Sequence, residues 1–130
     1  MRTDIAALGR EILNRLIIVG SPRTNGRSAH LANMLFETCI EECPDDELAL
    51  APVSTLSVAG CTGCDACRDN IAKLVELGEE AIDDDFAPCV IDDDMQEIYE
   101  LIDAADEITV VSPVYFAGLP SQLKAPLDRL

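Results

Sequence analysis

The sequence has 130 residues, of which 25 are acidic and 9 basic, and its formal net charge is −16. With 48% hydrophobic residues the chain can bury the core of one domain, but it is too short for two full domains. This charge argues against a nucleic-acid partner, since phosphates are bound by Lys and Arg, and no apolar run approaches the roughly 20 residues that cross a bilayer. Without a signal-peptide pattern at the start, we expect a cytoplasmic protein, where clustered Cys more often bind metal or carry redox chemistry than form disulfides.

Strand and helix patterns alternate along the chain. The predicted strands cover residues 16–19, 47–53 and 108–111, and we expect the first and third to be buried. The predicted helices cover residues 28–43, 69–82, 93–104 and 120–130, with Pro126 breaking or kinking the last one. A loop rich in Cys and Gly occupies residues 54–68. This order predicts an α/β fold with a parallel sheet covered on both faces.

The loop that joins the first strand to the first helix has the chemistry of a phosphate site. It reads GSPRTNGRS over residues 20–28, inside a stretch from residue 12 to 36 that contains no acid. Such a loop offers backbone N–H groups and the positive end of a helix. Its side-chain donors and cations are Ser21, Asn25, Ser28, Arg23 and Arg27. The loop matches neither a Walker A motif nor a G-x-G-x-x-G fingerprint, and an ordinary turn capped by Ser28 explains the same residues.

Three cysteines follow the spacing Cys-x2-Cys-x2-Cys. Cys61, Cys64 and Cys67 can converge from one tight loop, a pattern typical of [4Fe–4S] ligation with a fourth ligand from elsewhere. The best fourth ligand is Cys89, which stands beside a proline. A zinc site with the same four thiolates, free thiols and a disulfide formed during purification remain alternatives.

The other reactive side chains receive structural interpretations. We expect Cys39 and Cys43 to be small buried apolar residues on the first helix. Lys124, Asp128 and Arg129 are interpreted as solvated pairs on the last helix. No Ser-His-Asp set or defined carboxylate pair emerges, so no protein side chain is predicted to be catalytic.

Two separated stretches resemble one family. Residues 20–32, GSPRTNGRSAHLA, are similar to the FMN-phosphate loop of the flavodoxin-like NAD(P)H-dependent FMN reductases. Residues 110–129, VVSPVYFAGLPSQLKAPLDR, resemble the second flavin loop of the same family. Within that superfamily the chain is most similar to the iron-sulfur flavoproteins, because the Cys loop and the Asp pair before Met95 follow in the family's order. The resemblance covers residues 15–130.

The resemblance implies a fold and a set of ligand residues. The fold would be a flavodoxin-like three-layer sandwich with strand order 2-1-3, formed by residues 1–130 as one domain that lacks the last two strands. A Cys-rich insertion at about 57–91 separates Cys67 from Cys89 by 21 residues, whereas the family's fourth Cys usually follows closely. The implied FMN-phosphate ligands are Ser21, Arg23, Asn25, Gly26, Arg27 and Ser28. The residues implied to line the flavin ring are Pro113, Val114, Tyr115, Phe116, Ala117 and Gly118.

The resemblance also implies an activity. The protein would be an oxidoreductase that moves electrons from NAD(P)H through FMN to an iron-sulfur cluster or an external acceptor. One alternative is a metal-binding or redox-sensing module of the same fold that binds no flavin. Another is a truncated form without activity. Because the third strand would leave an open sheet edge, we expect a homo-oligomer joined through that edge or the last helix.

Overall fold

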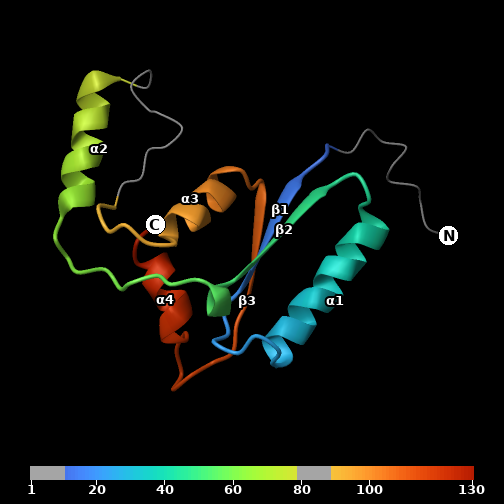
Figure 1. Ribbon diagram of the computed structural model, residues 1–130. Coiled ribbons are helices and arrows are strands. Elements are labelled where there is room, and N and C mark those ends of the chain that lie inside the picture. The colour runs from blue at the N-terminus through green and yellow to red at the C-terminus, as the bar shows by residue number, and fades with distance from the viewer. Residues whose placement is uncertain (1–10, 79–88) are drawn as a thin grey trace.

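A parallel three-stranded sheet lies at the centre of the computed structural model, which describes residues 11–78 and 89–130 (Figure 1). The strands are β1 (Asn14–Val19), β2 (Glu47–Pro52) and β3 (Glu107–Val111). Their order is β2-β1-β3, and both pairs are parallel. The α/β class, the flavodoxin-like strand order and the position of each strand predicted from the sequence are therefore confirmed.

Helices cover both faces of the sheet. The helix α1 (Arg27–Glu42) lies against one face, and α3 (Met95–Asp103) and α4 (Ser121–Leu127) lie against the other (Figure 1). Side chains of β1 alternate between the two faces, because successive residues of a strand point in opposite directions. Ile17 packs with Ala32 of α1, whereas Leu16 packs with Leu123 of α4. All four apolar residues of β1 are buried, as predicted.

The third strand is less buried than its composition predicts. Ile108 and Val110 are 44% and 45% exposed, so the expectation of a buried strand is wrong for this face. The reason is position: β3 pairs with β1 on one side only, and within the described residues no strand follows it. A run of β-branched residues shows a strand, but it does not distinguish an edge from a centre.

The helix after the cysteine loop stands apart from the sheet (Figure 1). This helix, α2, spans Ala66–Leu77 and has no buried residue. It starts three residues before the predicted position 69, so Cys67 belongs to its first turn rather than to the loop. Gly78 ends it with a φ of 86°, a left-handed conformation that glycine adopts readily. The predicted end at residue 82 lies outside the described residues.

Ion pairs and backbone contacts tie the strands together at their amino ends. Asp46, before β2, accepts a hydrogen bond of 2.6 Å from Nε of Arg15 on β1. The same guanidinium reaches Glu107 of β3 at 2.5 Å, and these two carboxylates raise the pKa of Arg15. Asn14 and Asp106 add a backbone N–H to carboxylate bond of 2.8 Å. All three strands are thus held in register at the same end.

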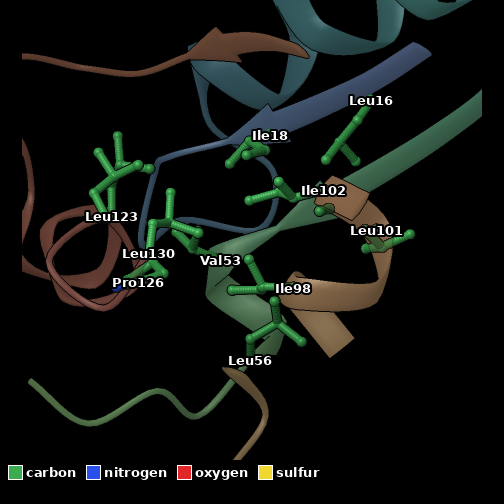
Figure 2. A pocket seen from close by; sticks show the side chains of 12 residues that line it. Leu16, Ile18, Val53, Leu56, Ile98, Leu101, Ile102, Leu123, Pro126 and Leu130 are labelled. Atoms are coloured by element: carbon green, nitrogen blue, oxygen red, sulfur yellow. The ribbon is translucent and has the colours of Figure 1, made fainter. Parts of the chain in front are cut away.

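An apolar hollow lies between α3, α4 and the sheet. Figure 2 shows it lined by aliphatic side chains from all three elements, among them Leu16, Ile98 and Leu123. No charged or hydrogen-bonding side chain lines it, so the hollow is a part of the core and offers nothing to orient a polar ligand. Among the described helices, none has the length and apolarity needed to cross a membrane.

Candidate functional site

Three loops leave the sheet at the carboxyl ends of its strands, where open parallel sheets bind their ligands. They connect β1 to α1, β2 to α2 and β3 to α4. The first and third loops approach closely at Gly20, whose N–H donates to the carbonyl oxygen of Val111 at 2.8 Å. A Cβ atom on Gly20 would lie 2.5 Å from Cδ2 of Leu123 and 3.1 Å from Cβ of Ser112. Only glycine lets these two loops meet without displacing a neighbour.

The β1–α1 loop delivers free donors to this edge. The N-cap of α1 is Gly26, no side chain caps the helix, and its first turn contains no acid. Ser21 is buried, and its hydroxyl accepts a hydrogen bond of 3.1 Å from the N–H of Arg23. Ser28 lies inside the helix, so the alternative of a Ser28-capped turn is wrong. An uncapped helix start beside two exposed arginines, at positions 23 and 27, fits a phosphate group.

The β3–α4 loop contains a tight, strained turn. Tyr115 and Gly118 exchange two backbone hydrogen bonds of 2.9 and 3.0 Å. The two residues between them, Phe116 and Ala117, have left-handed φ angles of 46° and 60°. Non-glycine residues rarely adopt this conformation, and it concentrates at ligand-binding sites. The Phe116 ring is fully exposed and Tyr115 is half-exposed, so aromatic surface is available to pack against a planar group.

The cysteine loop follows β2 and leads away from the sheet to α2 (Figure 1). Cys61, Cys64 and Cys67 are exposed. The N–H of Gly63 donates to Sγ of Cys61 at 3.4 Å. Gly63 and Asp65 both have left-handed φ angles, 69° and 61°, which turn the chain sharply on either side of Cys64. Three accessible thiols, one already accepting an N–H bond, have the donor chemistry of a thiolate metal site.

Cys89 lies in a different segment, shortly before α3. It is partly buried against the cluster formed by Met95, Ile98 and Tyr99. The pKa of Tyr99 is raised, mainly because the ring is buried and next because of the Cys89 sulfur, with a smaller contribution from Cys67. In the described part of the chain, however, no three metal-binding side chains are yet grouped closely enough to hold an ion.

The first helix carries the remaining two cysteines, Cys39 and Cys43. Both are partly buried rather than fully buried as expected. They lie one turn apart on α1, and the N–H of Cys43 donates to the carbonyl oxygen of Cys39 at 2.8 Å as part of the end of the helix.

A buried ion pair, which the sequence did not reveal, lies beneath the cysteine segments. The Arg129 guanidinium, 1% exposed, donates to Oδ2 of Asp93 at 2.6 Å. Asp93 also accepts from the N–H groups of Ala59 at 2.8 Å and Met95 at 3.1 Å. Mainly because of Arg129, the pKa of Asp93 is lowered to about 2. The prediction that Arg129 is a solvated residue is therefore wrong, whereas Lys124 does pair with Asp128 on the surface.

The sequence contained only an indirect signal for this pair. The run of three aspartates at 92–94 was identified as a helix start, and the N–H of Met95 does donate to Asp93. Nothing in the local pattern indicates that the next partner of Asp93 is 36 residues away. A long-range pair of this kind needs the fold before it can be seen.

Known proteins place the chain in a family. Residues 13–130 match the family described as NADPH-dependent FMN reductase. An iron-sulfur flavoprotein of Methanosarcina thermophila is 39% identical over 112 residues, which make up 86% of this chain and 49% of the relative. An iron-sulfur flavoprotein of Archaeoglobus fulgidus is 30% identical over 115 residues, 87% of this chain and 43% of the relative. One from Methanocaldococcus jannaschii is 31% identical over 112 residues, 86% of this chain and 49% of the relative.

The chain belongs to the NADPH-dependent FMN reductase family. It spans about half the length of the iron-sulfur flavoproteins that it matches. The resemblance to this family that the two flavin-like stretches indicated is confirmed.

Proposed function

We propose that this member of the NADPH-dependent FMN reductase family is a flavin-dependent oxidoreductase that passes electrons from NAD(P)H through FMN to a thiolate-bound iron-sulfur cluster or an external acceptor. The observation that carries the proposal is the meeting of two loops at one sheet edge. One loop presents an uncapped helix start and arginines, and the other presents exposed aromatic rings on a strained turn. A phosphate and a planar ring system joined in one molecule match both surfaces.

The residues of the first loop would hold the phosphate of FMN. Backbone N–H groups at the start of α1 and the guanidinium groups of Arg23 and Arg27 supply donors and positive charge to an anion that carries up to two negative charges. The side chains of Ser21, Asn25 and Ser28 and the backbone at Gly26 complete the proposed set. No acid of the first helical turn opposes the anion.

The residues of the third loop would orient the ring. The backbone of residues 113–118 follows its edge, and Tyr115 or Phe116 packs against its face. When FMN is bound, it supplies the hydride-accepting and single-electron chemistry, while the protein supplies orientation, hydrogen bonds and exclusion of water. The proposal needs no protein side chain as acid or base.

Cys61, Cys64, Cys67 and Cys89 would hold the cluster. The three exposed thiols of one loop and the partly buried thiol of another have the composition of a cubane site. They would be brought together by the cluster itself, since metal binding and local folding are coupled at such sites. A reducing cytoplasm would keep these exposed thiols available for ligation.

An FMN titration of the full chain tests the flavin part. Binding is followed by the change in flavin absorption and fluorescence, and riboflavin, which lacks the phosphate, is titrated in parallel. Arg23→Gln and Arg27→Gln should each weaken FMN binding by about 10–100-fold, the usual worth of a hydrogen bond to a charged group, and leave riboflavin binding unchanged. Lys73→Gln, on the distant helix α2, is the matched control for charge and should change neither.

The same samples separate the alternatives. Iron and acid-labile sulfide, measured beside flavin absorption after anaerobic purification, distinguish a flavoprotein with a cluster from a metal-binding module without flavin. If the wild-type chain takes up no FMN, the oxidoreductase proposal fails. If NADH and NADPH both leave bound FMN oxidised under anaerobic conditions, the nicotinamide donor is wrong.

We also propose that the protein forms a homo-oligomer. Among the described residues no strand pairs with the outer edge of β3, and Ile108 and Val110 of this strand are half-exposed. Backbone groups and apolar side chains therefore lie on one strip of surface. A second copy that adds its own strand or helix to this strip would satisfy both.

A further inference from the structure

The Arg129 guanidinium connects the two segments that carry the cysteines. Its Nη1 donates to the carbonyl oxygen of Ala59 and its Nη2 to that of Ile91, each at 3.1 Å. Ala59 stands two residues before Cys61, and Ile91 stands two residues after Cys89. Figure 1 shows the C-terminus lying beside the segment that leads into α3, which is where these bonds form. One side chain thus fixes the entrance of the first cysteine segment and the exit of the second.

The position of this cation is fixed from several sides. The Asp93 carboxylate that pairs with Arg129 also accepts a hydrogen bond from the N–H of Ala59 at 2.8 Å. Arg129, Asp93 and Ala59 are therefore each bonded to the other two. The backbone carbonyl of Arg129 accepts a hydrogen bond of 2.5 Å from the Tyr99 hydroxyl. A buried guanidinium with two carbonyl acceptors and one carboxylate has little freedom to reorient.

One donor of this cation remains unused. Nε of Arg129 is buried and has no hydrogen-bond partner among the described residues. A buried N–H without an acceptor costs about 1–3 kcal/mol, so proteins seldom leave one unpaired without a reason. Cys89 packs against the cluster that contains Tyr99, whose hydroxyl bonds to the backbone of Arg129, and it stands two residues before Ile91, which accepts from Nη2. The sulfur of Cys89 therefore lies in the segment that the guanidinium already holds.

We propose that Arg129 is the positioning residue of the cysteine site, holding both cysteine segments in place and donating its free Nε–H to a sulfur atom of the assembled site, with Cys89 as the nearest ligand. This inference rests on the proposed binding of a cluster by the four cysteines. Arg129 is then a hydrogen-bond donor that is not itself a ligand and that holds the cysteine segments in position before metal binds. Its guanidinium also places a fixed positive charge next to the proposed cluster, which carries negative thiolates and becomes more negative on reduction.

Two measurable effects follow from a cation and donor at this place. Hydrogen bonds from outside the ligand set commonly change metal retention by about 10–100-fold. Hydrogen bonds to the sulfurs and nearby charge also set the reduction potential of a cluster, and a positive charge favours the reduced, more negative form. Loss of the guanidinium should therefore speed iron loss and lower the potential. A residue that only supports the fold would not shift the potential of clusters that remain bound.

The experiment compares the wild-type chain, Arg129→Lys and Arg15→Lys after anaerobic reconstitution with iron and sulfide. Lysine keeps the charge but lacks Nε and the planar fork. We expect Arg129→Lys to release iron to a chelator about 10–100-fold faster than the wild type and to show a lower midpoint potential. Arg15→Lys makes the same change in an ion pair at the amino ends of the strands. It should match the wild type in iron release and in midpoint potential.

The outcomes separate this inference from the function that it builds on. If Arg129→Lys matches the wild type in iron release and potential, the inference is wrong and the proposed cluster stands. If the wild type itself takes up no iron, the proposed cluster is wrong and the role of Arg129 falls with it.

A second measurement decides the matter if far-UV circular dichroism shows that Arg129→Lys does not fold. The Nε–H resonance of Arg129 is then followed by NMR in the unaltered chain, before and after loading with Cd²⁺. A downfield shift on loading supports the bond to sulfur, and an unchanged resonance refutes it.

Discussion

Replacing Asp93 with asparagine isolates the charge of the buried pair while keeping the size of the side chain. The carboxylate is 14% exposed and its partner Arg129 is 1% exposed, so solvent screens the pair weakly. A pKa that falls from 3.8 to about 2 corresponds to about 2.5 kcal/mol of stability, at about 1.4 kcal/mol per unit. Removing one partner from a fully buried pair typically costs about 3–5 kcal/mol. Asparagine retains an acceptor oxygen, so we expect Asp93→Asn to lower the free energy of unfolding by about 2–4 kcal/mol at pH 7.

The pH dependence gives this prediction its sign. The pKa of this carboxyl group is lower in the folded state than in the unfolded state, where it is near 4. The group therefore stabilises the folded state fully above pH 4, and this contribution is lost as the pH falls through about 2. The difference between the wild type and Asp93→Asn should therefore be constant from pH 7 to about 5. The difference should shrink between pH 4 and 2, where the wild-type carboxylate becomes protonated and therefore uncharged, like the asparagine.

Urea unfolding, followed by far-UV circular dichroism because the chain has no Trp, measures the difference at each pH. Asp92→Asn is the matched control: it makes the same charge change one residue away, at an exposed position. It should stay within about 0.5 kcal/mol of the wild type. A difference for Asp93→Asn below about 0.5 kcal/mol at pH 7, or one that persists undiminished at pH 2, would refute the buried-pair argument.

Three further substitutions test other parts of the structure. Gly20→Ala should destabilise the chain by about 1–3 kcal/mol in the same unfolding assay, because the new methyl group overlaps Leu123; an unchanged midpoint would contradict the close approach of the two loops. Ala117→Gly should stabilise the flavin-free chain by about 0.5–1 kcal/mol, since glycine relieves the left-handed strain at some entropic cost, and a loss of stability would show that the turn is relaxed. The double change of Ile108 and Val110 to Lys should reduce the molar mass measured by light scattering to that of one chain, whereas an unchanged assembly would exclude this face of β3 as the contact.

Local chemistry explains why much of the fold could be predicted from the sequence. The run Leu16–Val19 is apolar at every position, as expected for a strand buried on both faces, and the structure buries all four. The Gly, Ser and Arg residues after it fix a loop and a helix start over a few neighbouring positions. Both features are patterns over a few neighbouring residues, so a single sequence contains the information.

The parts that escaped prediction depend on distant contacts. Whether Ile108 is buried depends on what covers β3, and the strand's own residues do not specify it. Arg129 sits next to an exposed Lys–Asp pair in a polar helix end, and only the folding of residues 59 and 91 around it makes it a core residue. The position of Cys67 in a helix has a local cause instead, because Asp65 starts α2 in a left-handed conformation.

The ionic contacts of Arg15 have a consequence for how this protein can change over time. They fasten the three strands at the end of the sheet opposite to the ligand-binding loops. Strand register is therefore set independently of loop composition. Insertions and substitutions in the loops can alter which ligands bind without shifting one strand against another. The insertion at about 57–91 that the resemblance to the family predicts would be of this kind.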